Sequence, residues 1–172
     1  MTEPDWDNVP LIAGSGGVLT EELRTSHSGR KALMLTRQGN PSEFLSLSKT
    51  MDIDVVEIIS QKGRSNPRLH FGKGRLEAIR DELRMAPESH PWFGIDLILV
   101  NANLTPRQLV NLTDLLQCET WDRVRLLLEL FTQHASSVEA RNQVRIARLN
   151  ADRNILRELV NRETTGERLG FG

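Results

Sequence analysis

The sequence IDLILVNANLTPRQLVNLTDLL, residues 95–116, decides the fold class. Its first six residues are nearly all apolar, as expected for a parallel strand that is buried on both faces. Thr105 and Pro106 predict a helix start, because threonine caps a helix and proline fits its first turn. Leucines then recur at helical spacing, at Leu109, Leu112, Leu115 and Leu116. A buried strand followed directly by a helix is the repeating unit of a parallel α/β sheet.

The same strand–helix unit occurs three more times. Short apolar or β-branched stretches, which are typical of strands, occupy residues 31–36, 55–59 and 118–121. The helices after them are expected to begin near Asn40, Gly74 and Arg123. Four such units predict an α/β fold with a small four-stranded, mostly parallel sheet, flanking helices and right-handed crossovers. We expect this domain to cover residues 30–134.

The two ends of the chain differ from this domain. Residues 1–29 contain several Gly and Pro and few periodic apolar positions, which predicts a flexible N-terminal arm. Residues 135–172 are expected to form a long helix followed by a glycine-rich turn.

The predicted C-terminal helix carries two apolar lines. One has heptad-like, coiled-coil spacing and is interrupted by Arg153; it consists of Ile146, Leu149, Leu156 and Val160. The other consists of Val144, Ala147, Ala151 and Ile155. A single helix cannot bury two stripes by itself. We therefore expect it to pack against a partner helix as well as the sheet domain, or against another chain.

Composition excludes several classes of protein. Apolar residues make up 38% of the chain, charged residues 26%, and the formal net charge is −1, which excludes a wholly disordered or disulfide-scaffold chain. No apolar run approaches the roughly 20 residues of a membrane span. A single cysteine, Cys118, permits no internal disulfide and fits a reducing compartment. We therefore expect a cytoplasmic protein.

A basic stretch without acids lies between the second strand and the next helix. Residues 61–75 (QKGRSNPRLHFGKGR) contain five basic side chains: Lys62, Arg64, Arg68, Lys73 and Arg75. Ligands of parallel α/β sheets bind beyond the carboxyl ends of the strands. Gly72 and Gly74 would permit close backbone approach, and a helix N-terminus attracts anions. The stretch is therefore either a phosphate-contact surface or a solvated loop.

The C-terminal helix has basic residues of its own. Arg141, Arg145 and Arg148 share one face, and Arg157, Arg162 and Arg168 continue toward the end of the chain. Acids are interspersed among them, which favours a salt-bridged, solvated face. The alternative is contact with nucleic acid, in which arginines neutralise phosphates.

Motifs for catalysis are missing. No segment matches a P-loop or a G-x-G-x-x-G fingerprint. Four histidines and one cysteine have no metal-ligand spacing. We therefore predict no catalytic residue, no metal site and no resident cofactor in this chain.

Three linked motifs resemble a known family. They are HFGKGRLEAI (70–79), LILVNANLTPRQLVNL (97–112) and ETWDRVRLLLELFTQHASSVEARNQVRIARLN (119–150). Together they resemble the N-terminal domain of HflX-type ribosome-associated GTPases, over about residues 31–172. The sequence departs from the family pattern at Val124-Arg125 and at residues 133–136.

The resemblance implies a parallel α/β domain, two long antiparallel helices and a downstream GTPase domain that uses GTP and Mg²⁺. It also implies binding to rRNA of the large ribosomal subunit, and action in ribosome splitting or rescue. Some members are linked to ATP binding by this N-terminal part. The second helix and the GTPase domain are not in the sequence, so we expect a truncated or divergent form without GTP hydrolysis of its own.

Three functional hypotheses follow. The first is a ribosome- and rRNA-binding module that uses residues 62–75 and the C-terminal arginines. The second is an ATP-binding domain with the nucleotide near Lys62, Arg64 and Lys73. The third is a dimerisation module that pairs through its C-terminal helix.

Overall fold

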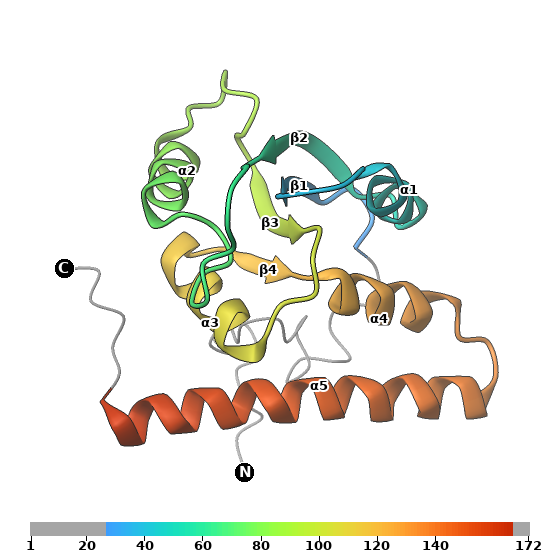
Figure 1. The fold of residues 1–172 in the computed structure, drawn as a ribbon. Coiled ribbons are helices and arrows are strands. Elements are labelled where there is room, and N and C mark those ends of the chain that lie inside the picture. The colour runs from blue at the N-terminus through green and yellow to red at the C-terminus, as the bar shows by residue number, and fades with distance from the viewer. Residues whose placement is uncertain (1–26, 167–172) are drawn as a thin grey trace, which may run out of the picture.

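The computed structural model describes residues 27–166. Its elements, in chain order, are β1 (Lys31–Thr36), α1 (Ser42–Thr50), β2 (Asp54–Ser60), α2 (Lys73–Met85), β3 (Ile95–Val100), α3 (Pro106–Leu116), β4 (Glu119–Trp121), α4 (Arg123–His134) and α5 (Val138–Thr165) (Figure 1). The prediction of a flexible arm lies outside the described residues except for its last three, 27–29. The glycine-rich turn beyond Gly166 also lies outside them.

The four strands form one sheet in the order β2-β1-β3-β4, with every neighbouring pair parallel. This confirms the predicted α/β class. The chain passes from β1 outward to β2 and then crosses back over β1 to β3. Because the direction reverses, right-handed crossovers place α1 on one face of the sheet and α2 and α3 on the other.

Both faces of the sheet are buried. Leu33 and Ile98, paired across β1 and β3, pack with residues of α2 and α3. Met34 and Leu99, also paired, pack with residues of α1 and α4, including Phe44. Strands β1 and β3 therefore supply side chains to two cores, which explains why both are apolar on both faces.

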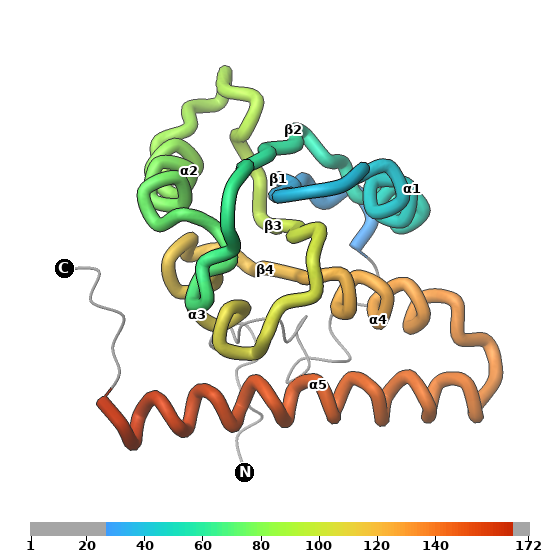
Figure 2. Tube along the Cα trace, viewed as in Figure 1, coloured from blue at the N-terminus to red at the C-terminus, as the bar shows by residue number. Residues whose placement is uncertain are grey.

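Helix α5 turns back after α4 and runs beneath α4 and α3 (Figure 2). Ser137 caps its start by accepting a hydrogen bond from the Ala140 amide at 3.0 Å, and Gly166 ends it in a left-handed conformation. The predicted long C-terminal helix is thereby confirmed.

The two apolar lines of α5 have different surroundings. Ile155 is buried, and Val144, Ala147 and Ala151 of the same line are half-buried against the body. The heptad line is bare: its exposed fractions run from 42% at Leu156 to 59% at Ile146, with Leu149 and Val160 between them. Within residues 27–166, α5 thus carries one packed and one uncovered stripe. No helix in this part of the chain is long and apolar enough to cross a membrane.

Candidate nucleic-acid interface

The basic loop, defined here as residues 61–75, leaves the carboxyl end of β2 and includes the first three residues of α2. Its own apolar residues, Leu69 and Phe71, are buried in the core under α2 and α3. The loop is therefore anchored at its C-terminal half, and its polar residues are left at the edge of the sheet. This edge is where ligands of parallel α/β sheets bind.

Arg37, directly after β1, ties the two halves of the basic loop together. Its buried guanidinium donates to the carbonyl oxygen of His70 at 2.9 Å and to that of Gly63. Burial, together with the nearby Arg37 charge, lowers the pKa of His70. His70 is therefore expected to be neutral at pH 7, and the positive charge of the loop comes from its lysine and arginine side chains.

Helix α3 also holds the basic loop. The Asn111 side chain donates to the Arg68 carbonyl oxygen at 2.7 Å, and the Gln108 side chain donates to the Asn66 carbonyl oxygen at 3.3 Å. Within the loop, the Asn66 carboxamide oxygen accepts from the backbone amides of Arg68 and Leu69. These hydrogen bonds fix the loop backbone before any ligand arrives.

The five basic side chains predicted from the sequence all lie on the surface at this edge. Those of Lys62, Arg64, Arg68 and Arg75 are exposed and make no hydrogen bond or ion pair within residues 27–166. Lys73 faces Glu77 at 3.7 Å, a weak exposed pair. The first turn of α2 contains no acid and has no side-chain cap. Its N-terminal amides therefore add to a positive surface suited to an anion.

The two glycines differ in what their small size permits. A Cβ atom on Gly72 would lie 2.8 Å from the Gln61 side-chain nitrogen, and the Gly72 amide donates to the Gln61 carboxamide oxygen at 2.9 Å. Gly72 thus makes room for a residue of its own chain. Gly74 has open space around its Cβ position, so it alone leaves room for close approach by a ligand.

The C-terminal arginines are not equivalent. Arg157 is exposed on α5. Arg162 is only 13% exposed and forms an ion pair with Asp114 of α3 at 2.7 Å, so it attaches α5 to α3. Arg168 lies outside the described residues. The structure therefore places Arg162 between two helices, where a phosphate would have to displace its partners.

Sequence reasoning missed a buried charge cluster between α4 and α5. The sequence favours a solvated face for Arg148, but this residue is 4% exposed and pairs with Glu129 at 3.2 Å. Arg125 hydrogen-bonds Asp152, and His27 pairs with Glu129 at 3.0 Å. Burial raises the pKa of Asp152. The one sequence signal is the spacing of Arg148, Asp152 and Ile155 on a single helix face.

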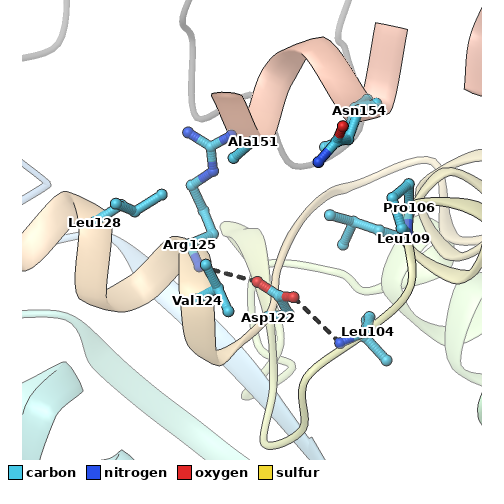
Figure 3. Close-up of a pocket in the computed structure, with 10 residues that line it drawn as sticks. Leu104, Pro106, Leu109, Asp122, Val124, Arg125, Leu128, Ala151 and Asn154 are labelled. Atoms are coloured by element: carbon cyan, nitrogen blue, oxygen red, sulfur yellow. Dashed lines mark hydrogen bonds between the residues drawn. The ribbon is translucent and has the colours of Figure 1, made fainter. Parts of the chain in front are cut away.

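A pocket of about 180 Å³ lies where α3, α4 and α5 meet (Figure 3). Its lining is mostly apolar and comprises Leu104, Pro106, Leu109, Asp122, Val124, Arg125, Leu128, Ala151, Asn154 and Ile155. The Asp122 carboxylate accepts from the Arg125 and Leu104 amides at 2.9 and 3.2 Å, and burial raises its pKa. None of the basic-loop residues lines this pocket. It is therefore separate from the basic loop.

Comparison with known proteins decides the family. The family model described as "GTP-binding GTPase N-terminal" matches residues 39–132. GTPase HflX of Thermococcus kodakarensis is 33% identical over 130 residues, which is 76% of this chain and 28% of that protein. The chain belongs to the HflX GTPase family. The resemblance carried by the three sequence motifs is thereby confirmed, and the match lies in the family's N-terminal domain.

Further HflX relatives agree with this assignment. GTPase HflX of Caldanaerobacter subterraneus subsp. tengcongensis is 37% identical over 109 residues, 63% of this chain and 24% of that protein. A GTP-binding protein from Sulfolobus solfataricus, solved in complex with GDP, superposes with a TM-score of 0.62. It is 24% identical, covers 78% of this chain and 40% of its own, and supports the fold. The chain spans about a quarter of the length of the curated HflX relatives it matches.

Proposed function

We propose that this HflX-family chain is an RNA-contacting module that binds phosphates of rRNA in the large ribosomal subunit. We assign it to a GTPase that acts in ribosome splitting or rescue. We assign hydrolysis of GTP with Mg²⁺ to the part of the HflX relatives, about three-quarters of their length, that lies outside the match. One observation carries the proposal: five basic side chains project from a loop whose backbone is held by Arg37, Gln108 and Asn111.

The contrast between basic side chains supports this proposal. Arg30, Arg125 and Arg148 are buried in ion pairs with acids of the body. The side chains of the basic loop are exposed, and an exposed cation at a phosphate releases condensed counterions. Pre-ordering of the loop lowers the entropy lost on binding. The module would therefore act by positioning the protein on the RNA, with no covalent chemistry in these residues. The exposed Arg157 is a further candidate for contact with phosphate.

Cosedimentation with purified large ribosomal subunits tests this function. We expect the chain to pellet with subunits at about 50 mM monovalent salt, and its affinity to fall about 100-fold by about 200 mM, because roughly four to five phosphates are neutralised. Cosedimentation that is absent at low salt, or that does not respond to salt, would contradict the proposal.

ATP binding at the same edge remains an alternative hypothesis with weaker support. The Gln61 side chain occupies the space beside Gly72, and Lys73 faces Glu77. Both features reduce the resemblance to a nucleotide-binding turn. Calorimetry with ATP and with an RNA fragment of equal charge separates the two hypotheses. A nucleotide site would recognise the base and bind ATP more tightly than the RNA fragment, whereas a phosphate-contact surface would bind the two ligands with similar affinity.

The uncovered stripe of α5 also supports a partner helix. Ile146 and Val160 occupy heptad a positions and Leu149 and Leu156 occupy d positions, a pattern typical of two-stranded coiled coils. The candidate partners are the helix that would follow in the family and a second copy of this chain.

Substituting both Leu149 and Leu156 by Glu is expected to abolish pairing while leaving the unfolding free energy within about 1 kcal/mol, because both side chains are about half exposed. Light scattering should show a wild-type mass that rises above 19.5 kDa with concentration, and a variant that stays at that value. A strictly monomeric wild type at high concentration would exclude stable self-pairing.

A further inference from the structure

Asn111 is a buried amide that contacts two separate parts of the molecule. It lies on α3, is 1% exposed, and uses both ends of its side chain. The nitrogen end donates to the Arg68 carbonyl oxygen of the basic loop at 2.7 Å. The oxygen end accepts from the guanidinium of Arg162 on α5. One carboxamide therefore joins the C-terminal part of α5 to the middle of the basic loop.

We infer that Asn111 is a positioning residue through which α5 sets the shape of the basic loop. An amide side chain has one accepting and one donating end, whereas a guanidinium can only donate. Arg162 therefore selects the rotamer that presents the Asn111 oxygen to α5 and its N–H groups to the Arg68 carbonyl. In the opposite rotamer, two oxygens would face each other at the loop.

The position of Arg162 is itself determined by α3. Its guanidinium is fixed by the 2.7 Å ion pair with Asp114, one helical turn after Asn111. The second contact of α3 with the loop, from Gln108 to the Asn66 carbonyl, is longer at 3.3 Å, and long hydrogen bonds are weaker. Loss of the Asn111 hydrogen bond would therefore free the loop around Arg68. A displacement of α5 would change the loop without any movement of the sheet.

The consequence for RNA rests on the proposed function. If the basic loop contacts phosphates, Arg162 raises their affinity without touching them. This separates Arg162 from Lys62, Arg64 and Arg68, for which direct contact is proposed. It also gives α5, the element that leads out of the α/β domain, an influence on the contact surface.

Amide hydrogen exchange of the full chain, measured without RNA, tests the coupling. Replacing Arg162 by Ala is expected to accelerate exchange of the Leu69 and His70 amides about fivefold, because they bond to Asn66 within the released loop segment. Arg162→Lys, which keeps the positive charge but donates from a single nitrogen, should restore part of the protection. Arg157→Ala is the matched control: it removes an arginine from the same helix at an exposed position and should leave the loop unchanged.

Two outcomes separate this inference from the proposed function. Equal loop exchange in the Arg162→Ala and Arg157→Ala proteins would overturn the coupling, even if the wild type binds large subunits in a salt-dependent way. Faster loop exchange in Arg162→Ala, together with no RNA binding by any variant, would support the coupling and reject the RNA function. A merely structural role of Arg162 predicts faster exchange along α5 with no change at residues 66–70.

Discussion

Replacing Arg125 by Met is expected to lower the free energy of unfolding by about 3–5 kcal/mol. Arg125 is 2% exposed, hydrogen-bonds Asp152 of α5, and faces Glu129 at 3.8 Å. Without the charge of Arg125, the buried carboxylates of Asp152 and Glu129 have Arg148 as the one buried arginine left in this cluster within residues 27–166. Removing one member of a buried ion pair lowers the free energy of unfolding by far more than an exposed pair contributes, because the remaining charge stays desolvated.

Urea denaturation followed by circular dichroism measures this loss. Arg123→Met is the matched control, because Arg123 lies two residues earlier, is about one-third exposed, and bonds Asn101 at 2.9 Å; we expect a loss of about 1 kcal/mol. Equal losses in the two variants would show that the cluster does not stabilise the attachment of α5. Adding Asp152→Leu to Arg125→Met should recover much of the stability, because an apolar pair can replace a buried ion pair.

The loss should also depend on pH. Burial raises the pKa of Asp152, and Arg125 opposes that rise. Without Arg125 the pKa in the folded state would be higher still. The folded variant then binds more protons than the unfolded chain over a wider pH range, so its stability increases as pH falls through that range. The difference between wild type and Arg125→Met should therefore shrink under acidic conditions.

Reversing three charges of the basic loop, by Lys62→Glu, Arg64→Glu and Arg68→Glu, is expected to weaken RNA binding by at least about 100-fold. Each substitution removes a phosphate contact and adds a like-charge repulsion. The three side chains are exposed and unpaired within the described part of the chain. The folded state should therefore be retained, as circular dichroism and the urea midpoint can verify.

The control for this variant has the same change in net charge at another place. Lys31, Lys49 and Arg84 are exposed and lie outside the basic loop, and their joint replacement by Glu should weaken binding only a few-fold through the long-range field. Equal losses in the two triple variants would mean that net charge alone governs binding. The proposed role of the loop would then be rejected.

Local signals were sufficient to predict the fold. The strand at 95–100 and the cap at Thr105 identify β3 and α3, because a strand buried on both faces and a capped helix each leave a mark in consecutive residues. Thr105 caps α3 in the structure, and α4 begins at Arg123 as expected, where the Asp122 side chain caps it. Helix α2 begins at Lys73, one residue before the expected start.

The candidate site was predictable in part. The basic loop stands out because five cations and no acid fall within fifteen consecutive residues. The roles of Arg148 and Arg162 were not predictable, since each depends on the path that α5 takes across α3 and α4. Asn111 lies among the leucines of α3, and nothing in the sequence indicates that two distant segments bind its side chain. Such contacts exist only after tertiary folding.

The salt dependence of binding to rRNA of the large subunit tests the central claim most directly. For wild-type protein, the logarithm of the association constant plotted against the logarithm of salt concentration should have a slope of about −4, as expected for about five phosphate contacts. The loop variant with three reversed charges should retain a slope of about −1.5 from its two remaining cations. A wild-type slope near zero, or an identical slope in the variant, would contradict the assignment of the basic loop as the RNA-contact surface.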